Sequence, residues 1–127
     1  MIRSKTLILH VEDDASQQSL VRITLERSGA YEVHSAGDGD QALHAARARA
    51  PQLLLLDLDL PGMDGIAALR GLRAVEGLRD VPVVFLTAAG PERMDDELRS
   101  LGVREVLGKP FSPRVLVQTI DRVLAGA

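Results

Sequence analysis

The 127-residue chain contains no cysteine, and this absence removes several kinds of chemistry at once. Disulfides, thiolate zinc sites and a cysteine nucleophile are excluded, and the composition is compatible with a reducing compartment. No apolar stretch approaches the length that a membrane-spanning helix needs, and the chain does not open with a signal-peptide pattern. We therefore expect a cytoplasmic protein without membrane contacts.

The chain also lacks a strong charge of one sign. Its formal net charge is -3, and the lysines and arginines are scattered and form no basic patch. Because nucleic-acid binding depends on clustered positive charge, we expect no direct contact with DNA or RNA. The length suits one domain with an ordinary hydrophobic core, so we predict that residues 1–127 form a single domain.

Short apolar runs alternate with segments that carry helical patterns. The first helix is expected to open at Asp14, to carry Leu20, Val21 and Leu25, and to end at Gly29. This alternation predicts an α/β fold with a parallel sheet covered on both faces. The predicted strands are 7–11, 31–35, 53–57, 83–87 and 105–107, and the remaining helices are expected over 42–46 up to the break at Pro51, 64–75, 91–102 and 112–125.

The composition of the runs predicts the order of the strands. Residues 53–57 and 83–87 are almost entirely apolar, as expected of central strands, whereas 31–35 alternates and 105–107 is short. This pattern favours a doubly wound sheet in the order 2-1-3-4-5. In such a sheet the ligand site lies outside the carboxyl ends of strands one and three.

Acidic residues follow both of these strands. Glu12 and Asp13 come after the first, and Asp57 and Asp59 come at the end of the third. Carboxylates brought together would repel one another unless a cation lay between them, and oxygen ligands with several waters suit Mg²⁺. Asp14 is better explained as a helix N-cap than as a ligand.

The other strand ends supply the groups that a phosphoryl group requires. Thr87 ends the fourth strand and offers a hydroxyl, and Lys109 follows the fifth and offers a positive charge. Asp57 is then the candidate covalent acceptor in a phosphoryl-transfer site. The simpler interpretation of Asp57, a polar turn after a buried strand, does not account for these neighbours.

Four motifs, VEDD, LLLLDLDLPGMDG, FLTAAG and GKPF, stand in this order across the chain. Together they resemble the receiver domain of two-component response regulators, of the CheY-like superfamily, and the resemblance covers essentially the whole sequence. It implies a flavodoxin-like (βα)5 fold. It also implies a phosphorylation-dependent signalling switch that is not an enzyme in the ordinary sense but promotes its own phosphorylation and dephosphorylation.

The resemblance also implies a role for each site residue. Asp57 would take a phosphoryl group from the phosphohistidine of a histidine kinase or a phosphotransfer protein. Thr87 and Lys109 would contact the phosphoryl oxygens, and the Lys109–Pro110 peptide would be cis. The Mg²⁺ ligands would be Asp57, Asp13, the backbone carbonyl of Asp59 and, through water, Glu12.

The chain departs from the family pattern at two places. Val106 stands where the family often has an aromatic residue, so the usual partner of the Thr87 rotamer is absent. Asp59 lies two residues after the acceptor, and Ala89 two after Thr87. We expect this pair to tune the access of water to the acyl phosphate.

Two other functional classes remain open. A pseudo-receiver that serves only as a binding scaffold usually lacks the acceptor, an acid or the lysine, and all are present here. An aspartate-nucleophile phosphatase of the haloacid dehalogenase kind is suggested by DLDL, but its motif belongs on the first strand of a longer chain. Turnover of an aryl phosphate would distinguish this class from a signalling switch.

The remaining candidates have structural explanations. We expect structural roles for His10, His34 and His44, and Val117 is either part of a partner surface near the fourth and fifth helices or an ordinary exposed residue. The downstream partner is a protein that the sequence does not identify. The sequence also leaves open whether the receiver stands alone or belongs to a longer protein, and whether it is a monomer or a phosphorylation-dependent dimer.

Overall fold

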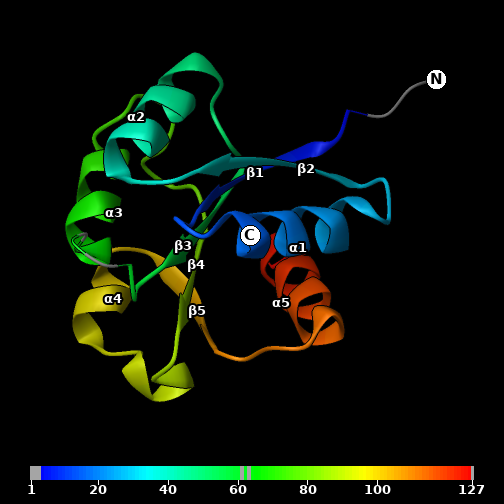
Figure 1. The fold of residues 1–127 in the computed structure, drawn as a ribbon. Coiled ribbons are helices and arrows are strands. Elements are labelled where there is room, and N and C mark those ends of the chain that lie inside the picture. The colour runs from blue at the N-terminus through cyan, green and yellow to red at the C-terminus, as the bar shows by residue number, and fades with distance from the viewer. Residues whose placement is uncertain (1–3, 61, 63, 127) are drawn as a thin grey trace.

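A computed structural model describes residues 4–60, 62 and 64–126. In this part of the chain five parallel strands form one sheet in the order β2-β1-β3-β4-β5, which confirms the predicted order (Figure 1). The strands are β1 (Thr6–Val11), β2 (Tyr31–Ala36), β3 (Leu53–Asp57), β4 (Val83–Thr87) and β5 (Val103–Gly108).

Helices cover both faces of the sheet, as Figure 1 shows. One face carries α1 and α5, and the other carries α2, α3 and α4. The bounds are α1 (Ala15–Glu26), α2 (Gly39–Ala48), α3 (Gly65–Arg73), α4 (Asp96–Ser100) and α5 (Pro113–Ala125), with a short 3₁₀ helix η1 (Gly90–Arg93) before α4.

The central strands explain why the sheet is buried on both faces. Every residue of β3 and β4 is buried. Because side chains alternate along a strand, Leu54 and Leu56 pack into the core under α2 and α3, while Leu53 and Leu55 pack into the core under α1 and α5. The acceptor candidate Asp57 therefore stands at the end of the most deeply enclosed part of the fold.

Polar caps fix where the helices begin. The Asp14 side chain accepts a hydrogen bond from the backbone N–H of Gln17 at 2.9 Å, and Asp64 caps α3 in the same manner through Ile66 at 3.0 Å. These bonds satisfy backbone donors that the first helical turn leaves free. The predicted assignment of Asp14 as an N-cap is thus confirmed by its geometry.

The fourth helix begins later than predicted. Pro91 lies in η1, and the chain is then extended at Met94 before Asp95 caps α4. Gly90, the first residue of η1, has a φ of 71°, a left-handed conformation that suits glycine. The predicted α-helix starting at Pro91 was therefore wrong for residues 91–95.

The described residues contain no helix that is both long enough and apolar enough to cross a membrane.

Candidate functional site

Asp57 is held by contacts to both of its carboxylate oxygens. Its side chain is 3% exposed. The Nζ atom of Lys109 donates to Oδ2, and the backbone N–H of Asp59 donates to Oδ1 at 2.7 Å. A buried carboxylate needs such partners, because removing it from water without them is costly. The acceptor candidate is thus fixed in orientation before any ligand arrives.

Lys109 reaches this position from the loop after β5. Its backbone N–H donates to the carbonyl of Thr87 at 3.0 Å, which ties the loop to the end of β4. The peptide bond from Lys109 to Pro110 is cis. Lys109 and Thr87, which the sequence predicted at the same sheet edge, lie side by side in the structure.

Glu12 lies beside Asp57 at the end of β1. Its side chain is buried, and this burial, followed by hydrogen bonding to the Asp57 carboxylate, raises the pKa of Glu12 to about 7. The backbone N–H of Asp14 donates to Glu12 Oε2 at 3.2 Å and opposes part of the shift. The structure therefore places two carboxylates together, with Lys109 paired to Asp57.

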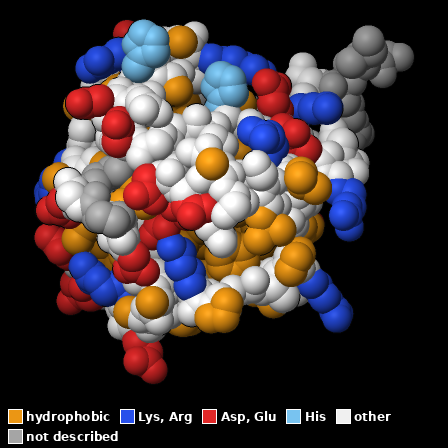
Figure 2. Space-filling model, viewed as in Figure 1, with side chains coloured by type: hydrophobic (Ala, Val, Ile, Leu, Met, Phe, Trp, Pro, Cys, Tyr) orange, Lys and Arg blue, Asp and Glu red, His pale blue; other side chains and the backbone are white. Residues whose placement is uncertain are grey.

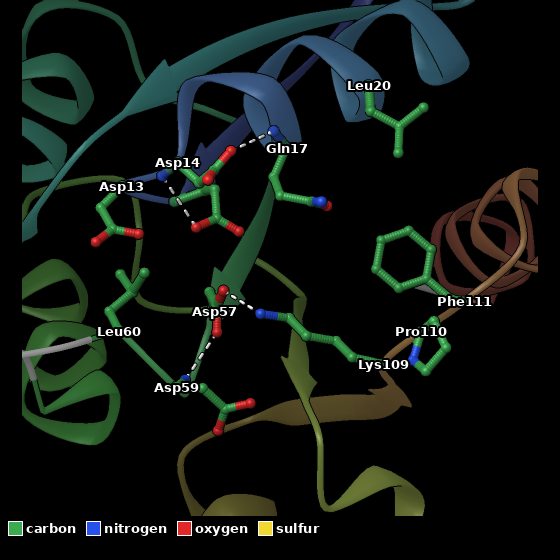
Figure 3. A pocket seen from close by; sticks show the side chains of 11 residues that line it. Asp13, Asp14, Gln17, Leu20, Asp57, Asp59, Leu60, Lys109, Pro110 and Phe111 are labelled. Carbon is green, nitrogen blue, oxygen red and sulfur yellow. Dashed lines mark hydrogen bonds and ion pairs between the residues drawn. The ribbon is translucent and has the colours of Figure 1, made fainter.

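Asp13 has a different setting from Glu12. It is exposed, and Figure 3 shows its carboxylate on the side of Leu60, apart from Asp57. Asp13 still lines the same cavity as Glu12, Asp57 and Asp59. Among the described residues no three acidic, histidine or cysteine side chains gather closely enough to form a metal site by themselves.

Thr87 is buried at the end of β4, and its hydroxyl faces Asp59. The hydroxyl donates to Asp59 Oδ1 at 2.9 Å, and the backbone N–H of Ala88 donates to Asp59 Oδ2 at 2.7 Å. From the sequence, only the backbone of Asp59 is expected to contact a metal ion. The two side-chain contacts depend on how the loop after β3 turns, so no local pattern indicated them.

A cavity of about 520 Å³ is lined by Glu12, Asp13, Asp57, Asp59 and Lys109, whereas Thr87 is not part of its lining. Figure 3 shows Gln17 and Leu20 of α1 on one side of it, and Pro110 and Phe111 on the side of Lys109. The sequence motifs predict no site role for Gln17, Leu20, Leu60 or Phe111. Leu20 is 48% exposed, unlike the buried Val21 and Leu25, and a helical wheel does separate it from those two residues.

The three histidines lie outside the cavity lining. His10 is fully buried in β1, and among the described residues neither ring nitrogen has a hydrogen-bond partner. Burial lowers the pKa of His10 to about 4, so the ring is neutral near pH 7. His34 is exposed on β2 and His44 is exposed on α2. No metal-binding group includes any of the three in the part of the chain that the structure describes.

Comparison with known proteins shows the family of the chain. The family model of the response regulator receiver domain matches residues 8–121. The chain belongs to this family of receiver domains. The family match and the strand order agree with the resemblance that the four sequence motifs carried.

Solved receiver structures share the fold along nearly the whole chain. The chemotaxis response regulator CheY4 of Vibrio cholerae is 30% identical and matches with a TM-score of 0.83 over 94% of this receiver and 99% of that chain. The receiver domain of the sensor histidine kinase PA1611 from Pseudomonas aeruginosa PAO1 is 32% identical, with a TM-score of 0.79 over 96% of this receiver and 99% of that chain. The PA1611 structure is described with a magnesium ion coordinated in its active-site cleft.

Curated relatives are transcriptional regulators. The phosphate regulon transcriptional regulatory protein PhoB of Escherichia coli is 41% identical over 119 residues, which are 92% of this receiver and 51% of PhoB. The DNA-binding response regulator MtrA of Mycolicibacterium paratuberculosis is 44% identical over 114 residues, 89% of this receiver and 48% of MtrA. The receiver thus spans about half the length of these relatives, so it is comparable with their receiver halves only.

Proposed function

We propose that this receiver takes a phosphoryl group onto Asp57 from the phosphohistidine of a histidine kinase or a phosphotransfer protein, and thereby switches its affinity for a partner protein. The observation that carries the proposal is the buried carboxylate of Asp57, which lines a cavity and is paired with Lys109. A carboxylate nucleophile with an adjacent cation is the arrangement that phosphoryl transfer requires.

The chemistry follows from the groups that surround Asp57. A carboxylate oxygen attacks phosphorus while the bond from phosphorus to the donor's imidazole nitrogen breaks, and the imidazole leaves with that electron pair. Lys109 is placed to balance the negative charge that accumulates on the transferred oxygens. The product is an acyl phosphate on Asp57, and attack by water on its phosphorus returns the free carboxylate.

The donor set of the cavity fits Mg²⁺. The acidic side chains that line it offer only oxygen donors, which Mg²⁺ prefers. Burial first, and the Asp57 carboxylate next, raise the pKa of Glu12, and a divalent cation would stabilise both carboxylates in their ionised form. Asp57, Asp13, the backbone carbonyl of Asp59 and, through water, Glu12 would hold the ion. When bound, Mg²⁺ supplies positive charge to the phosphoryl oxygens. Few side chains and several waters are typical of Mg²⁺ sites, which agrees with the absence of a three-residue cluster among the described residues.

The switch in this receiver would pass through the turn after β4. Thr87 moves toward the phosphoryl group, and the turn from Ala88 to η1 moves with it. Val106 is 4% exposed and packs in the core with Phe85 and Leu98, so it provides no side chain that rotates between core and solvent. Gly90 of η1 lies against Gly108 of β5. A Cβ atom added at Gly108 would lie 3.2 Å from the Cα atom of Gly90. This close contact supports transmission through backbone movement.

The phosphodonor would dock on a groove between α1 and α5. Figure 2 shows hydrophobic side chains gathered over these two helices. The groove is lined by Leu20, Ile23, Pro113 and Val117, and Leu20 also lines the acceptor cavity. A donor histidine must enter that cavity, so the protein surface around it would cover the adjoining groove. Val117 lines this groove, so the partner surface that it suggested would include the space between α1 and α5.

The proposal is tested by intact mass after incubation with acetyl phosphate and Mg²⁺. We expect the wild type to gain one phosphoryl group, and we expect no gain with Asp57→Asn or with a chelator. The matched control is Asp64→Asn, which makes the same substitution at the N-cap of α3 and keeps a side chain that can cap the helix. A gain by Asp57→Asn equal to that of the wild type would overturn the assignment of the acceptor.

A further inference from the structure

The Asp59 side chain connects the loop after β3 to the turn after β4. Its Oδ1 accepts the hydroxyl proton of Thr87 at 2.9 Å, and its Oδ2 accepts the backbone N–H of Ala88 at 2.7 Å. Both carboxylate oxygens are therefore engaged by neighbouring donors at the end of β4. The Thr87 hydroxyl itself accepts the N–H of Ala89 at 3.3 Å, so its own proton points to Asp59.

This arrangement cannot coexist with a bond from Thr87 to a phosphoryl group. A threonine hydroxyl has one proton and donates one hydrogen bond at a time. A phosphoryl group on Asp57 offers only acceptor oxygens, so it competes with Asp59 for that proton. It also adds roughly 1.5 to 2 negative charges at Asp57. The Asp59 carboxylate is only two residues away along the chain, and the backbone N–H of Asp59 donates to Asp57 Oδ1.

We propose that the Asp59 carboxylate competes with the phosphoryl group for hydrogen bonds. In the unphosphorylated receiver Asp59 accepts from Thr87 and Ala88, and it is displaced from both donors when Asp57 is phosphorylated. The inference rests on the proposed function, since it requires a phosphoryl group at Asp57. Asp59 acts here as a positioning residue, because it holds the turn after β4 in its resting place. Displacement of Asp59 releases both donors together and couples charge at Asp57 to the path toward η1.

The first test examines the contact itself, without Mg²⁺ or phosphodonor. We expect Asp59→Ala to move the Ala88 amide proton resonance upfield and to speed its exchange with solvent by about tenfold or more, because a hydrogen bond to a charged acceptor is lost. Asp59→Asn retains one acceptor oxygen, so its Ala88 shift and exchange rate should lie between those of the wild type and of Asp59→Ala. The matched control Asp80→Ala removes an exposed carboxylate outside the cavity and should leave Ala88 unchanged. An Ala88 resonance that stays in place in Asp59→Ala overturns the inference.

The second test measures competition with beryllofluoride, an inorganic phosphoryl mimic, at saturating Mg²⁺. Mg²⁺ affinity is titrated separately for each variant, since removal of a carboxylate weakens cation binding. We expect half-saturation by beryllofluoride at about tenfold lower concentration in Asp59→Ala than in the wild type, with Asp59→Asn between them. In the wild type, binding should also move the Ala88 resonance.

The outcomes separate this inference from the proposed function. If the wild type binds beryllofluoride and Asp59→Ala binds no more tightly, the competitor role is overturned and the acceptor role stands. If neither the wild type nor any variant binds beryllofluoride, the acceptor role of Asp57 and the competitor role of Asp59 are both overturned. The contact of Asp59 with Ala88 then has a structural role only.

Discussion

The ammonium group of Lys109 pairs with a carboxylate that is far less exposed than itself. The Lys109 side chain is 29% exposed and that of Asp57 is 3% exposed. Removing either partner therefore has different consequences: loss of the lysine leaves a buried charge beside Glu12, whereas loss of the carboxylate leaves a cation that water still reaches.

We therefore expect Lys109→Ala to lower stability and Asp57→Asn not to lower it. In Mg²⁺-free buffer Lys109→Ala should lower the free energy of unfolding by about 1–2 kcal/mol, below the range for fully buried pairs. Asp57→Asn should leave it unchanged or raise it, because repulsion with Glu12 disappears. Urea unfolding measures both, with Lys5→Ala as an exposed control. Equal losses in the two variants would contradict the asymmetry.

The second prediction concerns Mg²⁺ and the proton on Glu12. Burial and the neighbouring Asp57 carboxylate raise the pKa of Glu12 to about 7, so below this pH Mg²⁺ must displace a proton. The affinity for Mg²⁺ should therefore rise between about pH 6 and pH 8, by at most about tenfold per pH unit for one proton. Titrations followed by the chemical shifts of the β1 and β3 ends measure this dependence.

Glu12→Gln provides the control for that titration. It keeps the shape of the side chain and removes its proton equilibrium, so the affinity for Mg²⁺ should become nearly independent of pH in this range. Removal of Mg²⁺ by a chelator should also destabilise the wild type by about 2.7 kcal/mol when the ion was at a hundred times its dissociation constant. An equally steep pH dependence in Glu12→Gln would assign the proton to another group.

The sequence predicted the sheet better than the site, and the reason is physical. Runs such as 53–57 and 83–87 are apolar at every core position, so their burial on both faces follows from composition alone. The carboxyl ends of parallel strands share one edge, so the meeting of Asp57 with Lys109 also follows from topology. The contact of Asp59 with Ala88 depends on the path of two loops, which residue types do not determine.

The fourth helix shows the limit of local signals. Pro91 is typical of the first turn of a helix, and it does occupy that place, but in a 3₁₀ helix of four residues. The cap of Asp95 on Leu98 at 2.9 Å then starts α4. Two competing start signals lie four residues apart, and the chain uses both, with the extended residue Met94 between the two helices.

The third prediction uses the buried His10. Burial lowers its pKa to about 4, against about 6.5 in an unfolded chain. As the pH falls from about 6.5 toward 4, the unfolded chain binds a proton that the folded protein does not, so stability is lost over that window. At about pH 5 the loss from this residue should be about 2 kcal/mol.

His10→Leu should remove this loss. It eliminates the titrating ring and its two unpartnered nitrogens, so the free energy of unfolding should fall less than in the wild type between about pH 7.5 and pH 5. Urea unfolding at both values gives the difference, and His34→Leu, at an exposed position of β2, is the control. Parallel pH profiles for His10→Leu and the wild type would show that His10 does not titrate as described.

The last prediction separates the docking groove from the acceptor chemistry. Ile23 is 59% exposed and lines the groove between α1 and α5 but not the acceptor cavity. Ile23→Asp places a charge where an apolar partner surface would pack, so phosphotransfer from a histidine kinase or phosphotransfer protein should slow by about tenfold or more. Phosphorylation by acetyl phosphate should be unchanged, because a small donor does not need the groove. Val115→Asp changes an equally apolar exposed residue of α5 outside the groove lining, and it should leave both rates unaltered. Equal slowing of both donors by Ile23→Asp would mean that the variant disturbs the fold or the cavity, and unaltered transfer from the protein donor would remove the groove as its docking surface.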